Sequence, residues 1–481
     1  MRLTKLLENI EVKNSFSDYD ISEIITDSRK VTEGCVFVCI KGREFDGHSA
    51  ALKAAEKGAK AIISERQTGA PNEILVNSTR EALAKMSSSF YGEPSKKMKL
   101  IGVTGTNGKT STTHMIKKIL EYCGKKTGLI GTVSYMAGGE MLSSASLTTP
   151  KPQELHRIFK SMAESGCEYC VMEVSSQALA QGRCIGLEFS AAVFTNLTQD
   201  HLDYHGTMEN YANAKAKLFS QCKCAVLNKD DSRFDFMKNA VLSGDIIGYS
   251  KKDNRADYFA DNIHLGKAEC EYILYTKGKT YNNVRIDIPG EFTVYNSLAA
   301  ISCCSALGID TVRCVKALAE TGGVPGRAEV LKTDTPYTII IDYAHSPDAI
   351  ENILSSVRQF AKGRVIALFG CGGDRDKTKR PLMAQKAAEN ADYLIITSDN
   401  PRTENPDEII EDIIPGINGK GTSCAIISDR TQAIDYAIKN AREGDVIVLC
   451  GKGHETYQII GDEKIHYDER EIVKRILDKH K

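Results

Sequence analysis

The chain has 481 residues, of which 42% are apolar and 26% charged. These fractions are ordinary for a globular protein, and the length corresponds to roughly three domains of ~150 residues. Lys and Arg number 62 and Asp and Glu 63, which argues against nucleic acid as a partner, because neutralising phosphates requires a basic excess. No apolar run approaches the ~20 residues of a membrane span, and the N-terminus lacks a signal-peptide pattern. We therefore expect a soluble, cytoplasmic, multidomain monomer.

The chain contains 15 cysteines at scattered spacings. Cys167 and Cys170 form a lone C-x-x-C pair without the second pair of a zinc site. Most of the others lie within apolar, strand-like runs. We interpret them as buried thiols in a reducing compartment rather than as a metal or redox site.

The first block, residues 1–97, has short strand-like runs and a small helix, and it ends at the polar turn Gly92–Ser95. The runs are Val36–Ile40 and Ala61–Ser64, and the helix is Ser49–Lys57. The second block, residues 98–326, alternates apolar runs with helical patterns, which predicts a largely parallel sheet with helices on its faces. Its strand-like runs are Met98–Val103, Tyr169–Val174, Ala191–Leu197 and Ala225–Leu227.

The third block, residues 327–481, repeats this alternation. The expected strands are Thr338–Ile341, Val365–Phe369, Tyr393–Thr397, Cys424–Ile427 and Val446–Leu449. Ligands of open α/β sheets bind beyond the carboxyl ends of the strands. Polar clusters follow four of these strands, which predicts one shared cleft: Asp342–His345, Gly370–Arg375, Ser398–Arg402 and Gly451–Glu455.

A glycine- and threonine-rich loop joins the strand at Met98–Val103 to an amphipathic helix. Such a loop binds phosphates through backbone N–H groups and the helix N-terminus. Lys109 is suited to reach the β- and γ-phosphates, and the Thr110 hydroxyl is suited to Mg²⁺. The common pattern has a glycine where Val103 stands. The alternative is a glycine-rich turn with a solvated lysine.

Two further polar residues follow neighbouring predicted strands. Glu173 ends the run Tyr169–Val174, and His201 follows Ala191–Leu197. A carboxylate and an imidazole at adjacent strand ends are able to complete a Mg²⁺ shell with Thr110. Each residue, taken alone, is better explained as an ordinary polar side chain, and only their joint placement favours a metal site.

A series of motifs in one order resembles the Mur ligase family, the ATP-dependent amide ligases of bacterial peptidoglycan synthesis, and specifically its MurE type. The resemblance covers essentially the whole chain and rests on Thr104–Thr110, Met172–Ser176, Asn196–Asp203, Tyr211–Phe219, Asp342–Pro347 and Cys450–Glu455, with Asp27–Val31 and Gly42–Gly47 near the N-terminus. It implies an α/β protein of three domains. These are a small N-terminal UDP-sugar domain, a central P-loop ATPase-like parallel sheet, and a C-terminal Rossmann-like domain for the amino acid.

The resemblance also implies binding residues. Those for ATP are Gly105, Thr106, Asn107, Gly108, Lys109, Thr110, Ser111, Asn296, Arg327 and His345. Those for UDP-N-acetylmuramoyl-L-alanyl-D-glutamate are Ser28, Arg43, Glu44, Phe45, Thr148, Thr149, Ser175, Gln181 and Arg183. The catalytic group it implies is Lys109, Glu173, His201 and Lys215, and the Mg²⁺ ligands are Thr110, Glu173, His201 and Lys215.

Lys215 matches a lysine that is carbamylated in the family, which converts a cation into an oxygen ligand for Mg²⁺ by reaction with CO₂. Deprotonation of the amine requires a depressed pKa, which burial near a metal supplies. The residues alone place Lys215 and Lys217 on a helix. On that basis alone, we expect Lys215 to lie on a solvated helix face.

The third substrate that the resemblance implies is meso-diaminopimelate, because members that add it carry the motif Asp-Asn-Pro-Arg, here Asp399–Arg402. Diaminopimelate differs from lysine by one carboxylate, which a guanidinium grips bidentately. The implied site consists of Arg375, Asp399, Asn400, Pro401, Arg402, Gly451 and Glu455. An alternative for Asp399–Arg402 is a cap and turn before the helix expected at Pro406–Ile414.

The implied reaction forms an acyl phosphate on the D-glutamate γ-carboxylate, which the amine of diaminopimelate then attacks. Three alternatives stay open. They are an L-lysine-adding ligase of the same type, a ligase like folylpolyglutamate synthase, and a non-catalytic ATP-binding regulator on the same scaffold.

Overall fold

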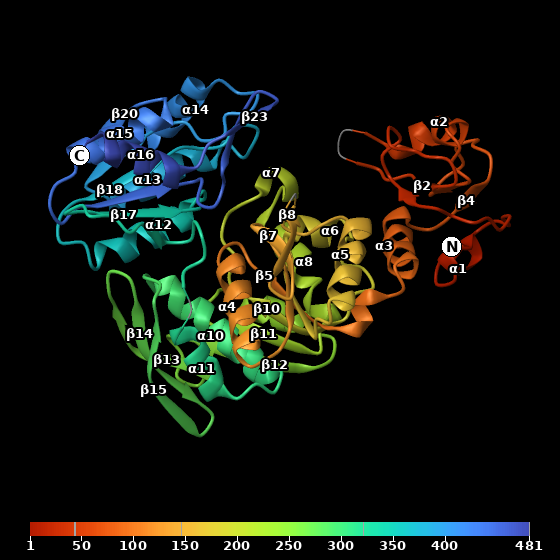
Figure 1. Ribbon diagram of the computed structural model, residues 1–481, viewed down its shortest axis with the longest axis horizontal. Helices are drawn as coiled ribbons and strands as arrows, with labels where there is room; N and C mark the ends of the chain where they lie inside the picture. Colours follow the sequence, from red (N-terminus) through yellow and green to blue (C-terminus); the bar gives the residue numbers. More distant parts are fainter. Residues whose placement is uncertain (43–44, 146, 321, 481) are drawn as a thin grey trace.

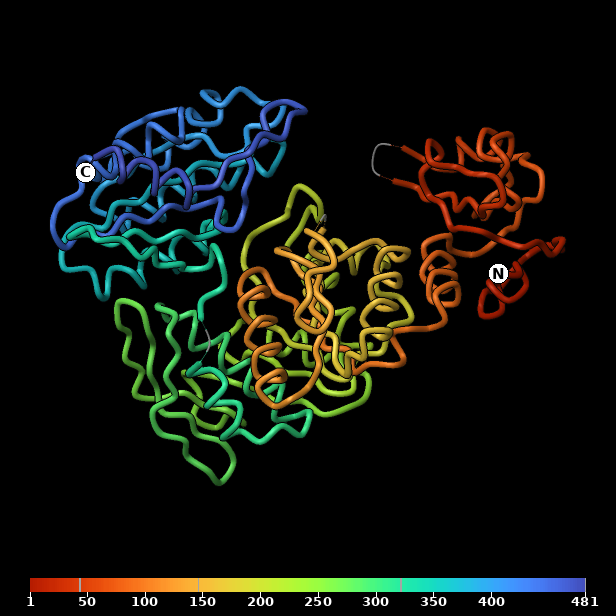
Figure 2. The backbone as a smooth tube through the Cα atoms, in the orientation of Figure 1, coloured from red at the N-terminus to blue at the C-terminus, as the bar shows by residue number. Residues whose placement is uncertain are grey.

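The computed structural model describes residues 1–42, 45–145, 147–320 and 322–480. Three units follow one another along the chain, each built around its own sheet (Figure 1). The N-terminal and C-terminal units lie on opposite sides of the central unit, as the backbone trace also shows (Figure 2). This mixed α/β architecture with mainly parallel sheets confirms the predicted fold class.

The N-terminal sheet has four parallel strands in chain order. They are β1 (Ile24–Ile25), β2 (Val36–Val38), β3 (Ala61–Ser64) and β4 (Glu73–Leu75). The helices are α1 (Leu3–Leu6), α2 (Ala51–Glu56) and α3 (Thr79–Phe90), with short 3₁₀ turns at Gly47–Ala50 and Pro94–Lys97. Ser78 caps α3 by accepting a hydrogen bond from the backbone N–H of Glu81, the usual role of serine at this position.

The central sheet has eleven strands in the order β15-β14-β13-β12-β11-β10-β5-β9-β6-β7-β8. The strands are β5 (Lys99–Thr104), β6 (Thr127–Ile130), β7 (Ser134–Ala137), β8 (Glu140–Ser144), β9 (Tyr169–Glu173), β10 (Phe189–Phe194), β11 (Cys224–Asn228), β12 (Asp245–Ser250), β13 (Tyr258–Leu265), β14 (Cys270–Thr276) and β15 (Lys279–Ile286). Its middle is parallel, whereas β7–β8 and β14–β15 add antiparallel edges. These edge strands were not predicted from the sequence; β8, for example, is largely exposed and lacks an apolar run.

Helices cover both faces of the central sheet. They are α4 (Lys109–Tyr122), α5 (Pro152–Glu164), α6 (Ser176–Ala180), α7 (Leu202–His205), α8 (Met208–Ala216), α9 (Phe234–Asn239), α10 (Glu291–Ala306) and α11 (Thr311–Ala319), with a 3₁₀ turn at Phe219–Gln221. Neighbouring β5 residues face opposite sides: Ile101 packs with α4 and α10, and Leu100 packs with α5. Burial on both faces explains why these strands are continuous apolar runs in the sequence.

The C-terminal sheet has the order β16-β17-β21-β18-β19-β20 and is parallel except at β16. Its strands are β16 (Glu329–Val330), β17 (Thr338–Asp342), β18 (Val365–Phe369), β19 (Tyr393–Ile396), β20 (Ser423–Ile426) and β21 (Val446–Cys450), and a separate hairpin pairs β22 (Tyr457–Ile460) with β23 (Glu463–His466). The helices are α12 (Pro347–Arg358), α13 (Lys379–Asn390), α14 (Pro406–Ile413), α15 (Arg430–Asn440) and α16 (Glu469–Lys479), with a 3₁₀ turn at Ile414–Gly416.

Four adjacent parallel strands, β17, β21, β18 and β19, end at one edge of this sheet. The predicted polar clusters therefore meet there. Backbone bonds join Gly451 to Asp342 and Gly373 to Asn400, which confirms that the clusters share one edge.

Two other expectations concern the whole chain. None of the helices among the described residues is both long and apolar enough to span a membrane. The cysteines are free thiols, most of them buried, in agreement with the sequence analysis.

Candidate active site

A cavity of about 470 Å³ lies between the phosphate loop, the ends of the central strands and the start of the C-terminal unit. Every residue that the family resemblance assigns to ATP lines it: Gly105, Thr106, Asn107, Gly108, Lys109, Thr110, Ser111, Asn296, Arg327 and His345. Glu173, His201 and Lys215 line it as well. The fold thus brings together residues that lie far apart in the sequence.

The phosphate loop runs from the end of β5 at Thr104 to the start of α4 at Lys109. Gly105 has φ +153°, and a Cβ there would lie 1.8 Å from Thr195 Oγ1, so only glycine fits. Lys109 Nζ donates to the carbonyls of Gly105 and Thr106, both at 2.8 Å. The lysine therefore folds back over its own loop at the cavity, where it is only partly exposed.

Glu173, at the end of β9, is buried and accepts three hydrogen bonds. Thr110 Oγ1 donates to its Oε2 at 3.0 Å, and the backbone N–H and hydroxyl of Thr132 donate at 2.8 and 3.0 Å. Arg327, from the C-terminal side of the cavity, donates to Thr110 Oγ1 at 3.1 Å. Thr110 and Glu173 therefore present adjacent oxygen atoms at the mouth of the phosphate loop.

Lys215 on α8 is 1% exposed, so the expectation of a solvated helix face is wrong. Its Nζ donates to the Gly105 carbonyl at 2.8 Å and lies 4.4 Å from the centre of the Tyr211 ring. Burial, together with the charge of Lys109, lowers the pKa of Lys215 well below its usual value. The site therefore favours a neutral, nucleophilic amine at this position.

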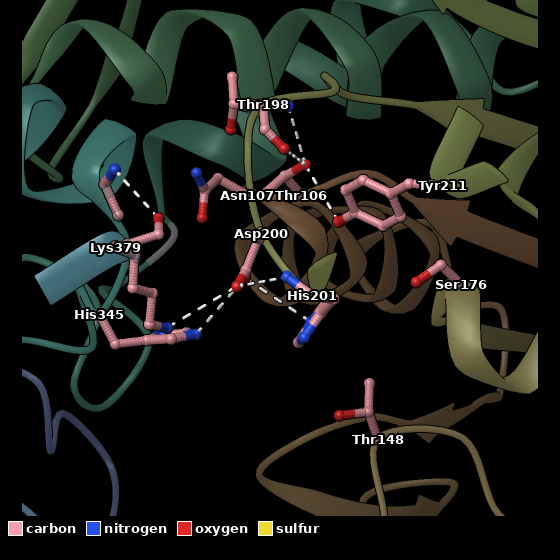
Figure 3. Close-up of polar contacts among 12 residues, drawn as sticks. Thr106, Asn107, Thr148, Ser176, Thr198, Asp200, His201, Tyr211, His345 and Lys379 are labelled. Carbon is pink, nitrogen blue, oxygen red and sulfur yellow. Dashed lines mark hydrogen bonds and ion pairs between the residues drawn. The ribbon is translucent and has the colours of Figure 1, made fainter. Parts of the chain in front are cut away.

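Asp200 lies between the central and C-terminal units (Figure 3). Its carboxylate lies 3.6 Å from His201 Nε2, 3.9 Å from His345 Nε2 and 3.7 Å from Lys379 Nζ. Burial alone would raise the pKa of Asp200, but the charge of Lys379 and the two imidazoles lower it. Burial also lowers the pKa of His201 to about 4, which leaves a neutral imidazole able to accept a proton or bind a metal.

Of the residues assigned to the dipeptide part of the substrate, Thr148, Thr149, Ser175 and Arg183 line the cavity, and Gln181 contacts it through Arg183. Arg183 donates from Nη1 to the Thr149 carbonyl at 2.6 Å and from Nη2 to Gln181 Oε1 at 2.7 Å. Ser175 donates its backbone N–H to Thr149 Oγ1 at 3.0 Å, and Thr148 shares a 3.1 Å bond with Thr132. Among the described residues, Arg183 has no ion pair with a carboxylate, so its charge is available for one.

The residues assigned to UDP lie in the N-terminal unit and do not line this cavity. Ser28 is half-buried in a turn, and Phe45 is 59% exposed. Arg43 and Glu44 lie outside the residues that the structure describes. The structure therefore groups the ATP and dipeptide residues but leaves the UDP residues apart.

A second polar cluster, assigned to diaminopimelate, lies at the edge of the C-terminal sheet. Asn400 donates to Glu455 Oε2 at 2.9 Å, and buried Lys452 donates to Asn400 Oδ1 at 3.0 Å. Gly451 has φ +114°, and a Cβ there would lie 2.4 Å from Asp399 Oδ2. Burial raises the pKa of Glu455, and Asp399 raises it further, while Lys452 opposes the shift.

Two guanidiniums, those of Arg402 and Arg375, lie near this cluster. Arg402 donates from Nη1 to the Gly373 carbonyl at 2.7 Å, and Arg375 donates to the carbonyl of Asp374 at 2.8 Å. In the described parts of the chain, neither forms an ion pair. Burial and the neighbouring charge of Arg375 lower the pKa of Arg402. The helix α14 takes its cap from Asn405, so capping does not account for Asp399–Arg402.

The following residues of this region were not predicted as site residues from the sequence: Thr195, Asp200, Asp348, Lys379 and Lys452. Asn107 donates to Asp348 Oδ2 at 2.6 Å, and the Thr195 hydroxyl donates to the Asn107 carbonyl at 2.6 Å. A signal existed for some of them, because Asp200 and Lys452 lie inside the motifs that carry the resemblance. For Lys379 no sequence signal existed, since it contacts the site only through the packing of two units.

Comparisons with known proteins agree with this geometry. Three family descriptions match the chain: "Mur ligase family, catalytic domain" over residues 20–91, "Mur ligase middle domain" over 103–304, and "Mur ligase, glutamate ligase domain" over 326–453. Together they span all three units of the structure.

Curated relatives match almost end to end. A UDP-N-acetylmuramoyl-L-alanyl-D-glutamate--2,6-diaminopimelate ligase of Geobacillus thermodenitrificans is 46% identical, over 95% of this chain and 94% of that protein. The ligase of the same name from Clostridium botulinum is 44% identical, over 99% of both chains.

Solved structures agree in fold. One described as UDP-N-acetylmuramoyl-L-alanyl-D-glutamate--2,6-diaminopimelate ligase has a TM-score of 0.71 and 32% identity, covering 100% of this chain and 99% of that one. Folylpolyglutamate synthase of Mycobacterium tuberculosis shares the fold at 16% identity, with a TM-score of 0.63 over 77% of this chain and 92% of that one. From the matched domains and the relatives at 44–46% identity, the chain belongs to the Mur ligase family.

Proposed function

We propose that this chain is the ATP-dependent ligase that adds meso-diaminopimelate to the D-glutamate γ-carboxylate of UDP-N-acetylmuramoyl-L-alanyl-D-glutamate. This reaction belongs to the cytoplasmic synthesis of peptidoglycan precursors. The observation that carries the proposal is the pair of guanidiniums of Arg402 and Arg375, which form no ion pair with a carboxylate of the described residues, together with Glu455, whose charge acts on Arg402. A diamine with two carboxylates complements that arrangement, and the phosphate loop supplies the ATP site.

The residues that line the cavity support an ATP site there. The backbone N–H groups of the phosphate loop and the N-terminus of α4 receive the phosphates. Lys109 moves from the carbonyls of its own loop to the phosphates, and Arg327 approaches the same position from the C-terminal unit. Asn296 and His345 border the nucleotide where the two units meet.

The residues present fit a Mg²⁺ ion that is shared with the phosphates. Thr110 and Glu173 offer adjacent oxygens, and Mg²⁺ commonly takes one or two carboxylates, with phosphates and water completing its shell. No group of three His, Cys, Asp or Glu side chains suited to a metal occurs in the described ranges, so the nucleotide must supply ligands. When bound, Mg²⁺ neutralises charge on the phosphates. His201 and a carbamate on Lys215 complete the proposed ligand set.

Lys215 has the environment that carbamate formation requires. A neutral amine attacks CO₂, a nitrogen–carbon bond forms, and one proton leaves, which produces an anionic carbamate. The buried position and the nearby Lys109 favour the neutral amine that starts this step. The resulting carbamate stabilises the Lys109 cation, which otherwise faces a second buried amine.

The proposed reaction has two steps on the dipeptide carboxylate. The γ-carboxylate attacks the γ-phosphorus of ATP, and ADP leaves. Lys109 and the loop N–H groups stabilise the charge that moves between the oxygens. The amine of diaminopimelate then attacks the acyl carbon, and phosphate departs from the tetrahedral intermediate. Arg183 holds the dipeptide, with Thr148, Thr149, Ser175 and Gln181 around it.

Each of the three units binds a different substrate in this proposal, with proposed boundaries at residues 97/98 and 326/327. The N-terminal unit holds the UDP part through Ser28, Phe45, Arg43 and Glu44. The C-terminal unit presents the amino acid, and the contact of Asp200 with Lys379 and His345 brings it against the central unit. Exclusion of water by this contact protects the acyl phosphate from hydrolysis.

The test measures phosphate release and product mass with ATP, the UDP-dipeptide and one amino acid at a time. We expect turnover with meso-diaminopimelate to exceed turnover with L-lysine. Faster turnover with L-lysine would contradict the assignment of Arg402. Turnover of a folate with glutamate would favour the folylpolyglutamate synthase alternative, and absence of phosphate release with all substrates would indicate a non-catalytic protein.

A further inference from the structure

The two arginines proposed to bind the substrate carboxylates stand on two different loops. Arg375 ends the loop of residues 370–375, which follows β18, and Arg402 lies in the loop of residues 399–404, which follows β19. We call them the Arg375 loop and the Arg402 loop. Two like charges repel each other, so a structural element must hold the loops together before any substrate arrives.

The backbones of the two loops are in direct contact. Gly373 donates its N–H to the Asn400 carbonyl at 3.0 Å, and a Cβ at Gly373 would lie only 1.9 Å from the Pro401 carbonyl oxygen. Asp374 and Arg402 both have positive φ, +54° and +52°. Residues other than glycine seldom adopt a positive φ. They keep it only where contacts with the surrounding structure hold the backbone in place.

Glu404 makes the contacts that hold this arrangement. Its Oε1 accepts the backbone N–H of Asp374 at 2.5 Å, which fixes the Arg375 loop at its left-handed residue. Both carboxylate oxygens accept from Arg380 in a bidentate pair, Oε1 from Nη2 at 2.9 Å and Oε2 from Nη1 at 3.0 Å. Lys377 lies 3.0 Å from Oε2. One carboxylate on the Arg402 loop thus binds the Arg375 loop and the helix α13 that follows it.

Arg380 anchors this carboxylate to the body of the unit. Its side chain is 1% exposed, and Nη1 also donates to Asp412 on α14 at 2.8 Å. Bidentate guanidinium–carboxylate pairs define orientation as well as distance. The side chain of Glu404 is therefore held on α13 by Arg380 and, through Arg380, is linked to α14.

We propose that Glu404 is a positioning residue, which holds the Arg375 and Arg402 loops at the one separation that receives an amino acid with a second carboxylate. This inference rests on the proposed function. It assigns selectivity for the third substrate to a residue that does not touch that substrate. Thr403 contributes to the same junction through its hydroxyl, which donates to Asp374 Oδ1 at 2.7 Å.

The test compares the variant Glu404→Gln with the unmodified chain, using separate titrations of all substrates. Glutamine keeps the shape and one acceptor but removes the charge that pairs with Arg380. We expect the KM for meso-diaminopimelate to rise about 10–100-fold, since small displacements of binding groups have effects of this size. We expect kcat at saturation and the KM values for ATP and the UDP-dipeptide to stay within about threefold, and the weak use of L-lysine to be unchanged.

The matched control is Glu408→Gln, an exposed glutamate on α14, which we expect to leave all constants unchanged. Thr403→Val is a milder second variant at the same junction. It tests the positioning role if Glu404→Gln does not fold. We expect it to raise the KM for meso-diaminopimelate in the same direction, by a smaller factor.

The outcomes separate the two claims. An unchanged KM for meso-diaminopimelate in both variants, or an equal rise of all three KM values, would overturn the positioning role of Glu404. An unmodified chain that does not use meso-diaminopimelate would instead overturn the proposed function.

Discussion

The side-chain amide of Asn107 donates a 2.6 Å hydrogen bond to Asp348, which lies 241 residues further along the chain. Asn107 belongs to the phosphate loop, and Asp348 lies in the first turn of α12 in the C-terminal unit. This bond joins the loop that receives ATP to the unit proposed to present the amino acid. The position of the C-terminal unit is therefore coupled to the phosphate loop itself.

Replacing Asp348 with alanine removes this bond between the two units. We expect kcat to fall about tenfold, because the acceptor amine is then presented less accurately to the acyl phosphate. Small-angle scattering should show a larger radius of gyration for the variant. The matched control is Asp348→Asn, which retains an acceptor oxygen and should resemble the unmodified chain. Equal radii for the alanine variant and the unmodified chain would contradict the role of this bond.

Carbamylation of Lys215 has a direct spectroscopic test. After incubation with ¹³C-bicarbonate, we expect a carbamate carbon signal in the NMR spectrum of the unmodified chain. Lys215→Ala should lack the signal and lose most of its activity. Lys217→Ala, which changes an exposed lysine at the end of the same helix, should retain both. A signal that survives in Lys215→Ala would show that the carbamate forms elsewhere.

Substituting Arg402 tests the selectivity for the third substrate. Arg402→Lys keeps the positive charge but loses the planar, bidentate geometry that matches a carboxylate. We expect kcat/KM for meso-diaminopimelate to fall by about 100-fold. The second carboxylate of this substrate would lose its bidentate partner, and a polar group left unpaired in a binding site strongly disfavours that substrate. Constants for L-lysine should change little. A parallel loss for both amino acids would mean that Arg402 supports the fold rather than selectivity.

Lys452 is a buried cation that the sequence analysis did not select, and its loss should destabilise the protein. Its side chain is 0% exposed and lies 3.4 Å from Glu455 and 3.9 Å from Asp399. Lys452→Met leaves these carboxylates unpaired, and we expect the free energy of unfolding to fall by about 3–5 kcal/mol. Urea titration measures this change. Lys474→Met, at an exposed position on α16, is the control and should be neutral.

The pairing of Glu404 with Arg380 predicts a pH dependence of stability. Hydrogen bonds from Arg380 lower the pKa of Glu404 from 4.5 to about 2. A lowered pKa in the folded state gives stability that is present above the unfolded value, and this stability is lost as the pH falls from 4.5 towards 2. The advantage of the unmodified chain over Glu404→Gln in unfolding free energy should therefore shrink on acidification, by about 1–2 kcal/mol. A difference that is independent of pH would contradict the pairing.

The strands and the phosphate loop could be predicted because their signals are local. β18 spans Val365–Phe369 as expected, β9 ends one residue before the predicted run, and β5 is shifted by one residue at both ends. These strands are buried on both faces, so each is a continuous apolar run. The edge hairpins β7–β8 and β14–β15 were missed, because β7 is only four residues long, β14 alternates between buried and part-exposed residues, and β8 and β15 are largely exposed, so none of them is a long apolar run. The domain boundaries and the role of each site residue stay predictions.

The sequence by itself determined the class of fold, the family and the chemistry of the phosphate loop, since each depends on short motifs and on runs of apolar residues. Only the tertiary structure decided which side chains are charged, buried or paired. The pattern of residues around Lys215 predicts that its side chain is exposed to solvent. The packing of α8 against the phosphate loop instead buries its amine. Burial and pairing depend on residues that are far apart in the sequence, such as Asp200 and Lys379. No local sequence pattern shows that such residues lie close together in the folded chain.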